Sequence, residues 1–317
     1  MRNKFAELLY KSAIEDSRIH IVVADISPAG SMAKFRNEFP ERFINVGVAE
    51  QAMIGICAGL AREGAIPFAY TIAAFSVVRP FEFIRDDIAL ANLNVNIVGI
   101  GGGLVYSTLG PTHHTTDDIG LISLLPGMQI FSPADTTEVE SVLSYRLGEN
   151  QTLGPAYIRL GKSGEPLLPS SGHKEIDITN NICKIKSTLE SKVILIGYGL
   201  MAHRALALSE YLIQKFQINA DVASMPFTYP INWTNVALNL ENYSVICIIE
   251  EHLDNGSIGM QFVSNHIVKL KTTKILRFNL GSKFIKNYGS HEEILNANGL
   301  SLEEMANTIN ENIREPK

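Results

Sequence analysis

The sequence has few of the features that mark secreted or membrane-spanning proteins. It contains 3 cysteines in 317 residues, Cys57, Cys183 and Cys247, which lie far apart in apolar contexts. This usage is typical of buried thiols in a reducing cytosol, and it provides neither a disulfide framework nor a zinc-binding spacing. Residues 1–7 contain no apolar signal-peptide core, and no uncharged run is long enough to cross a bilayer. We therefore expect a cytoplasmic protein without a membrane partner.

An excess of basic residues is also lacking. Lys and Arg number 27 against 33 Asp and Glu, which gives a formal net charge of −6 at pH 7. Nucleic-acid-binding proteins usually present a basic face, so this balance argues against a nucleic-acid partner. Hydrophobic residues make up 46% and charged residues 19% of the chain, the composition of a globular protein with a sizeable core. A length of 317 residues is sufficient for two domains.

Patterns typical of strands and of helices alternate along the chain. Apolar runs typical of buried strands occupy residues 19–24, 65–71, 95–100 and 245–250, whereas helical spacing occurs at 4–16, 79–91 and 136–146. This alternation predicts an α/β protein with two domains, each a mostly parallel sheet flanked by helices. Gly, Pro and Ser cluster in residues 161–173. We place the domain boundary there, with domains at residues 1–165 and 166–317.

One stretch combines a strand pattern, a turn and an acid. Residues 43–46 include apolar strand formers, Gly47 permits a turn, and Glu50 opens a helical pattern carried by Met53, Ile56, Cys57 and Leu60. An acid in the first turn of a helix that follows a strand lies where ligands gather in open α/β sheets. The helix dipole favours any glutamate at that position as well. By spacing alone, Glu50 is therefore either a binding residue or a solvated acid at a helix start.

The residues of this stretch, Val-Gly-Val-Ala-Glu-Gln-Ala-Met at 46–53, resemble the segment with which the transketolase superfamily supplies a glutamate to thiamine diphosphate. The resemblance implies that Glu50 is catalytic and contacts N1′ of the cofactor's aminopyrimidine. A carboxyl group in an apolar site can hold or share a proton near neutral pH, which suits this role. The resemblance also implies a pyrimidine-binding domain followed by a transketolase C-terminal domain, with Asp25 and Val48 at the cofactor.

A second stretch, Thr-Ile-Ala-Ala-Phe at residues 71–75, corresponds to the family pattern Thr-Phe-x-x-Phe, whose aromatic side chains hold the aminopyrimidine. Phe75 retains one of these aromatics, whereas Ile72 and Val78 stand where the family has the others. The resemblance implies that all three side chains line the cofactor site, with less ring stacking than is usual. The alternative for Phe75, from the sequence alone, is an ordinary core position.

The loop Gly-Pro-Thr-His-His at residues 110–114 is followed by Asp117 and Asp118. A His and an Asp four residues apart can bind a metal on a helix, but the Gly-Pro pair favours a loop. Gly-Pro-Thr-His resembles a motif of transketolases and deoxyxylulose-phosphate synthases in which the histidine faces the substrate. The resemblance implies that His113 is catalytic and binds substrate, polarising or protonating its oxygens. The role of His114 stays open.

Two motifs lie further along the chain. Arg159 ends a strand pattern at a place where the family uses an arginine to hold a sugar phosphate, a role suited to the planar guanidinium. An ordinary surface arginine is the alternative.

Residues 197–202, Gly-Tyr-Gly-Leu-Met-Ala, fit a loose dinucleotide-binding fingerprint. An acid, Asp221, lies about the right distance further on, but it opens the next strand, whereas a ribose-binding acid should close it. A tight strand-to-helix turn is therefore favoured.

One motif of the family is missing. No Gly-Asp-Gly occurs in the sequence, and in the family this motif, with a following Asn, holds Mg²⁺ and the diphosphate. The resemblance covers only the second half of a full-length transketolase. It therefore implies a separate N-terminal (α) subunit that supplies the Mg²⁺ ligands, none of which come from this chain. It further implies a homodimer of this chain within an α2β2 assembly.

These resemblances favour the C-terminal subunit of a two-component transketolase, which moves a two-carbon ketol unit between sugars or sugar phosphates. A β subunit of a 2-oxo acid dehydrogenase, or an enzyme similar to deoxyxylulose-phosphate synthase, is an alternative, and a non-catalytic scaffold is a third. Aligned on His113, Leu109 and Gly101 replace an Asp and a His that contact the donor in ordinary transketolases. A leucine cannot accept a hydrogen bond, so we expect altered discrimination of hydroxyl groups near the reacting carbon.

Overall fold

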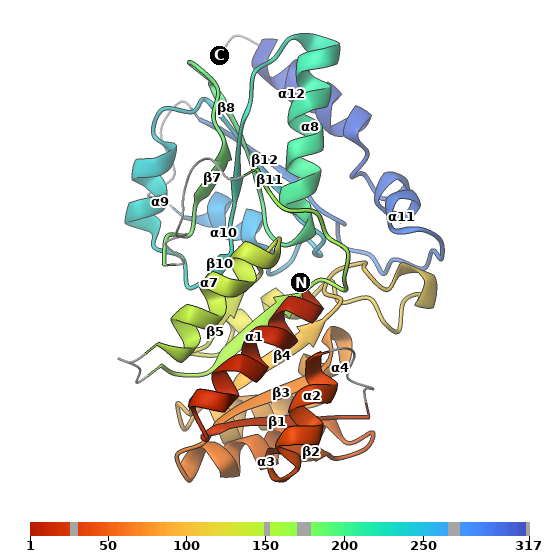
Figure 1. Ribbon diagram of the computed structural model, residues 1–317. Helices are drawn as coiled ribbons and strands as arrows, with labels where there is room; N and C mark the ends of the chain where they lie inside the picture. The colour runs from red at the N-terminus through yellow and green to blue at the C-terminus, as the bar shows by residue number, and fades with distance from the viewer. Residues whose placement is uncertain (26–30, 149–152, 170–178, 266–272, 315–317) are drawn as a thin grey trace.

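A computed structural model describes residues 1–25, 31–148, 153–169, 179–265 and 273–314. Within these residues the chain forms two sheets, each made mainly of parallel strands and each flanked by helices (Figure 1). The predicted fold class is therefore confirmed. Of the predicted boundary segment 161–173, residues 170–173 lie outside the described residues.

The first part of the chain alternates between strands and helices, as its pattern predicts. Its elements are α1 (Arg2–Glu15), β1 (Ile19–Val23), α2 (Ser31–Glu38), η1 (Pro40–Arg42), β2 (Phe43–Asn45), α3 (Glu50–Arg62), β3 (Ile66–Ile72), α4 (Ala73–Val77), α5 (Phe81–Phe83), η2 (Ile84–Ala89), β4 (Asn96–Ile100), η3 (Ser107–Leu109), α6 (Asp118–Ser123), β5 (Gln129–Phe131), α7 (Thr136–Leu147) and β6 (Ala156–Leu160).

The second part of the chain repeats this alternation. Its elements are β7 (Cys183–Lys186), β8 (Val193–Gly197), α8 (Leu200–Phe216), β9 (Asp221–Ser224), β10 (Phe227–Tyr229), α9 (Trp233–Leu240), β11 (Val245–Ile249), α10 (Ile258–Ser264), β12 (Lys274–Phe278), α11 (His291–Ala297) and α12 (Leu302–Arg314). Gly199, with φ 53°, makes the turn between β8 and α8, so the fingerprint-like segment is a strand-to-helix turn, as expected.

The first sheet has the strand order β10-β5-β6-β4-β3-β1-β2, in which all neighbours are parallel except β10 and β5. Helices α1, α2 and α7 pack on one face, and α3, η2 and α6 pack on the other. The edge strand β10 comes from the second part of the chain. Its Phe227 stacks on Phe131 of β5 with ring centroids 5.0 Å apart, and this apolar contact secures the strand to the first sheet.

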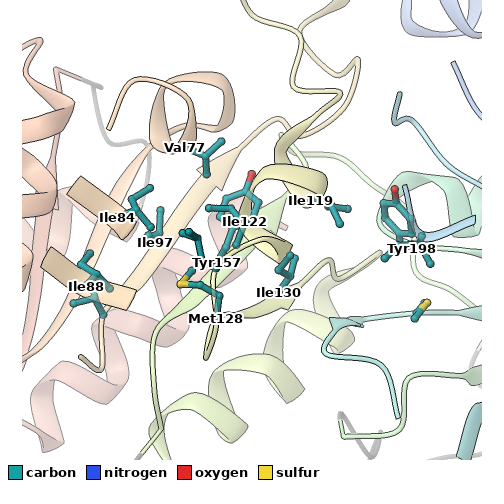
Figure 2. Close-up of a cluster of buried hydrophobic side chains, with 14 of the residues drawn as sticks. Val77, Ile84, Ile88, Ile97, Ile119, Ile122, Met128, Ile130, Tyr157 and Tyr198 are labelled. Atoms are coloured by element: carbon teal, nitrogen blue, oxygen red, sulfur yellow. The ribbon is translucent and has the colours of Figure 1, made fainter. Parts of the chain in front are cut away.

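The second sheet has the order β12-β11-β8-β9-β7, with β7 antiparallel to β9. Alternate residues of β8 point to opposite faces, as strand geometry requires. Val193 and Leu195 face the core that includes α8 and α12, whereas Ile194 and Ile196 face the core that includes α9 and α10. This second core continues into the first domain, where Ile119 and Ile122 of α6 lie between Tyr198 and the residues of the first sheet (Figure 2).

Two local predictions need correction. The helical pattern at residues 79–91 forms the short α5 and then the π-helix η2, and the wider turn of η2 buries Ile84 and Ile88 but leaves Phe83 exposed. Cys183, expected to be buried, is partly exposed in the edge strand β7. In the described residues, we find no helix with the length and apolar character needed to span a membrane.

Candidate active site

Glu50 is the first residue of α3 and lies at the carboxyl edge of the first sheet. The chain leaves β2 at Asn45 and turns at Gly47, whose φ of 69° is a left-handed conformation that suits glycine. The Asn45 Oδ1 atom accepts a hydrogen bond from the Gly47 backbone N–H over 3.0 Å and stabilises this turn. The Glu50 side chain is then directed inward, and the residue is only 3% exposed. The solvated alternative is therefore wrong.

Arg79 is the charge partner of Glu50. Its Nη1 donates a hydrogen bond to Oε1 of Glu50 over 2.9 Å. The Cζ atom of the same guanidinium lies 4.2 Å from the centroid of the Phe75 ring, within the range of a cation–π interaction. A carboxylate that is almost fully buried requires such a partner, since an unpaired buried charge is strongly destabilising. The glutamate, the arginine and the aromatic ring thus form one contacting group.

His113 joins this group through Phe75. The two rings meet edge to face, with centroids 5.2 Å apart. The Thr112 Oγ1 atom lies 3.0 Å from Nδ1 of His113, so Nε2 is the nitrogen on the side away from this contact. Phe75 itself lies in α4, directly after β3. The structure therefore brings Glu50, Phe75 and His113 together, although they come from three separate segments of the chain.

The remaining residues predicted at the cofactor lie at the same edge of the sheet with more exposed side chains. Asp25 follows β1, Val48 follows β2 and Ile72 ends β3, and the carboxyl ends of parallel strands share one edge. Ile72 is partly buried, whereas Val48 is 70% and Val78 is 49% exposed. Phe75 and Ile72 are thus the more enclosed of these predicted apolar residues, and the two valines are the more exposed.

Arg159 is placed differently from its predicted role. The residue is 6% exposed, and its Nε donates to Oδ2 of Asp118 over 2.8 Å. The Tyr157 hydroxyl donates to the same oxygen over 2.8 Å, and burial raises the pKa of this phenol well above its ordinary value, which keeps it a donor. The expectation that Arg159 holds a sugar phosphate does not fit these contacts. Its charge is already balanced inside the protein by Asp118.

His114 is partly buried beside His113. Burial lowers its pKa, and this effect exceeds the opposing influence of the Ile285 carbonyl and of the Glu251 charge. The ring is therefore neutral over a wider pH range than an exposed histidine. Over the described ranges of the chain, no three His, Cys, Asp or Glu side chains gather as a metal site, so the His–Asp pattern of this loop does not build one there.

Arg2 was not among the residues that the sequence indicated. Its Nε is buried and has no hydrogen-bond acceptor within the described part of the chain. Its positive charge opposes the rise that burial produces in the pKa of Tyr106. Lys162 Nζ is 5.4 Å from the centroid of the Tyr106 ring, which lies 6.3 Å from that of His113. A buried guanidinium nitrogen without an acceptor is uncommon and requires an explanation, of which a bound ligand is one. No sequence pattern reveals it.

Gly101 and Tyr106 share one volume next to His113. Gly101 has φ 78°, and a Cβ added there would lie 2.2 Å from Cε2 of Tyr106. No larger side chain fits at residue 101 unless the tyrosine ring moves. The Tyr288 ring packs in the same way against Gly110, while Leu109 is exposed. The surface around His113 is therefore shaped by tyrosine rings.

Two family models match the chain: the pyrimidine-binding domain of transketolase over residues 1–165 and the transketolase C-terminal domain over residues 183–305. The chain therefore belongs to the transketolase family, as the resemblance predicted, and is a transketolase-like transferase. It corresponds to the C-terminal section of that family. Membership implies thiamine diphosphate as the cofactor.

Relatives of similar length are subunits of other transketolases. The chain is 29% identical to one subunit of the apulose-4-phosphate transketolase of Actinobacillus succinogenes, over 75% of this chain and 74% of that protein. It is 31% identical to the SqwH subunit of the 6-deoxy-6-sulfo-D-fructose transketolase of Clostridium sp., over 78% and 77%. It is also 26% identical to 1-deoxy-D-xylulose-5-phosphate synthase of Acinetobacter baumannii, but spans only 47% of that protein.

Solved structures show the same relation. A split gene transketolase, described as an inactive β4 tetramer, superposes with a TM-score of 0.81 and 28% identity, over 98% of this chain and 96% of that one. Transketolase from Campylobacter jejuni superposes with a TM-score of 0.78 at 20% identity, which shows the fold alone, over 98% of this chain and 46% of that one. The chain thus spans about half the length of that transketolase.

Proposed function

We propose that this chain is the C-terminal (β) subunit of a two-component transketolase, which transfers a two-carbon ketol unit between sugar substrates. The contacting group of Glu50, Arg79, Phe75 and His113 at one sheet edge carries this proposal. It brings an acid, an aromatic ring and a histidine together in a chain half the length of a full transketolase. A separate N-terminal (α) subunit completes the active site.

The residues at this edge fit the aminopyrimidine end of thiamine diphosphate. Glu50 is a buried carboxylate that already accepts a hydrogen bond from a planar cation lying over the Phe75 ring. A flat, hydrogen-bonding heterocycle makes contacts of the same kind. Glu50 would hold or release a proton at N1′, while Ile72, Val78, Val48 and Asp25 would surround the ring. The bound cofactor supplies the nucleophilic carbon of the reaction.

His113 acts on the substrate in this proposal. Its Nδ1 is close to the Thr112 hydroxyl, which leaves Nε2 to exchange a proton with a substrate oxygen. The edge-to-face contact with Phe75 orients the imidazole toward the cofactor end of the site. Substrate oxygens near the reacting carbon would therefore meet a histidine whose ring is held by two neighbours.

The α subunit supplies Mg²⁺ and its ligands in this proposal. The absence of a Gly-Asp-Gly motif from the sequence supports this division, because a diphosphate requires a cation with oxygen ligands. The names of two relatives, each called a subunit, support it as well. We further propose that two copies of this chain and two α chains form an α2β2 assembly. The cysteine usage supports a cytoplasmic location.

The substrate carries an anionic group in this proposal. Lys162 lies near Tyr106, whose ring adjoins that of His113. The charge of Arg2 acts on the pKa of the same tyrosine, and Arg2 Nε has no acceptor among the residues described. A phosphate or sulfonate suits such a guanidinium. Two relatives are named for substrates with such groups, apulose 4-phosphate and 6-deoxy-6-sulfo-D-fructose. Arg2, rather than Arg159, is the arginine that we assign to this group.

A synthase-like reaction is the second candidate, because the chain is also similar to deoxyxylulose-phosphate synthases. One experiment separates the two. The chain is co-expressed with an α subunit encoded beside it, and the complex is assayed with ketose phosphates and, separately, with pyruvate and an aldose phosphate. Transketolase activity predicts ketol transfer without carbon dioxide release, and loss of that activity in His113→Ala. Release of carbon dioxide from pyruvate favours the synthase-like reaction and contradicts our assignment.

A further inference from the structure

Glu50 has an internal partner at the place where the proposed function puts the cofactor. The residue is 3% exposed, so its carboxylate has little access to water. A carboxylate in such surroundings must be paired or neutralised. In this chain the pairing group is the guanidinium of Arg79, which donates from Nη1 over 2.9 Å. The charge of Glu50 is therefore already balanced by Arg79 before a cofactor binds.

The guanidinium of Arg79 has the chemical character of the ring that Glu50 is proposed to bind. It is planar and delocalised, and it donates hydrogen bonds in its own plane. It lies over Phe75 with Cζ 4.2 Å from the ring centroid while it donates to Glu50. One planar group thus makes both a stacking contact and a hydrogen bond to the acid. These two contacts are the ones that an aminopyrimidine ring needs at this site.

We propose that Arg79 is an internal stand-in for the aminopyrimidine ring, which occupies the contacts of Glu50 and Phe75 until the cofactor displaces it. The inference rests on the proposed function, because it takes the Glu50–Phe75 pair as the aminopyrimidine site. It adds a gate to that site. Cofactor entry and departure of Arg79 are one exchange, in which Glu50 passes from one planar partner to another without becoming unpaired.

The position of Arg79 permits this exchange. The side chain is 44% exposed, so it can move into solvent without disturbing the core. It is followed by Pro80 and the short helix α5, which begins at Phe81, so no regular helix holds its backbone. Glu82, three residues further along, is exposed and has no ion pair within the described ranges. A released guanidinium therefore has an acceptor nearby.

The stand-in lowers the apparent affinity of the free chain for the ring. When the competent state is only a fraction of the population, the apparent dissociation constant rises by the inverse of that fraction. If Arg79 occupies the site in about nine chains of ten, removing it tightens binding about tenfold, or about 1.4 kcal/mol. Binding of the α subunit would tighten ring binding by the same factor if it draws Arg79 away from Glu50.

The test uses thiamine, which lacks the diphosphate and therefore does not need Mg²⁺ ligands from a partner. Calorimetry measures thiamine binding to the full chain as wild type, Arg79→Met, Arg79→Lys and the control Arg85→Met. Arg85 is an exposed arginine on the same segment, 3.4 Å from Asp86. We expect binding about tenfold tighter in Arg79→Met, and an unchanged constant in Arg85→Met. Arg79→Lys, which keeps the charge without the planar group, should fall between wild type and Arg79→Met.

A chemical complementation adds an independent measurement. Arg79→Ala leaves the contacts of Glu50 and Phe75 open to a small planar cation, so methylguanidinium should compete with thiamine in this variant and not in the wild type. Equal or weaker thiamine binding in the Arg79 variants that fold, or no competition by methylguanidinium, overturns the stand-in role.

Ketol transfer by the wild-type complex is measured separately. If that complex is active while thiamine affinity is unchanged in the Arg79 variants, the gate is refuted and the proposed function stands. An inactive wild-type complex refutes the function itself.

Discussion

Arg159 and Asp118 form a buried ion pair in which Nε lies 2.8 Å from Oδ2. The pair joins the end of β6 to the first residue of α6, directly after the loop that carries His113. Its partner Tyr157 donates to the same carboxylate oxygen. The arginine therefore supports the loop that carries His113 from within the protein. This role differs from the direct contact with substrate that the sequence predicted.

The first prediction concerns this ion pair. Arg159→Met should lower the free energy of unfolding by about 3 kcal/mol, because it leaves the Asp118 carboxylate buried without its cation. The double variant Arg159→Met, Asp118→Asn should recover most of that loss, since no uncompensated charge remains. Urea unfolding of the three proteins measures both effects. A stable Arg159→Met variant whose only defect is a raised KM for phosphorylated substrates would restore the phosphate-binding role.

The second prediction concerns Arg2. Arg2→Met should raise KM for the anionic substrate about tenfold or more, since a charge-assisted hydrogen bond contributes about 1.5–3 kcal/mol. Lys4→Met is the matched control, because Lys4 lies on the same helix and only approaches Glu140 at 3.7 Å. Steady-state kinetics of the reconstituted complex measures both. Equal effects of the two substitutions on KM would remove Arg2 from the substrate site.

The third prediction concerns pH and the contact between the domains. His291 Nε2 lies 2.7 Å from Glu251 Oε1, and Glu251 Oε2 accepts from the Leu104 backbone N–H over 2.6 Å. The Glu251 charge raises the pKa of His291 above its ordinary value of about 6.5. The stabilisation is therefore fully present below about pH 6.5 and disappears as the pH rises through the higher folded-state pKa.

His291→Gln should consequently lose about 1.5 kcal/mol of stability at pH 6 relative to wild type, a typical value for a hydrogen bond to a charged group. The difference should shrink as the pH rises above the folded-state pKa of the histidine. Urea unfolding of both proteins between about pH 5.5 and pH 9 measures it. A difference that stays constant over this range contradicts the assignment of charge to His291.

The fourth prediction concerns discrimination between sugars. Leu109 is exposed on the loop before His113 and cannot accept a hydrogen bond from a donor hydroxyl. Leu109→Asp should therefore sharpen the preference between donors that differ in configuration at the hydroxyl next to the reacting carbon. A panel of ketose phosphates assayed with the reconstituted complex measures the ratio of kcat/KM values. Ordinary transketolase efficiency and stereoselectivity in the wild type would contradict the inference from Leu109 and Gly101.

The sequence predicted the features that depend on local pattern. The turn at Gly47, the helix start at Glu50 and the strand before Phe75 follow from periodicity and turn chemistry over a few residues. The α/β class follows from the alternation of such segments. Recognition of His113 needed the family motif as well, because a histidine in a loop has no periodic signature.

The partners of charged residues could not be predicted in the same way. Arg159 pairs with Asp118, 41 residues away, and Arg79 pairs with Glu50, 29 residues away. Such pairs can be predicted only when the sheet order is known. The local sequence around a strand-end arginine does not indicate whether its side chain faces substrate or a buried acid. The edge strand β10 was not predicted for a similar reason. It follows the predicted domain boundary, whereas its partner β5 precedes it.

We propose above that Glu50 is the acid that acts on thiamine diphosphate in a site completed by an α subunit. The most direct measurement is the exchange of the cofactor's C2 proton for deuterium in the reconstituted complex. Glu50→Gln keeps the shape of the side chain but cannot exchange a proton at N1′ as a carboxyl does. We predict exchange about a hundredfold or more slower in Glu50→Gln than in wild type, with assembly unchanged. Exchange at a near wild-type rate in the assembled Glu50→Gln complex would contradict this role of Glu50.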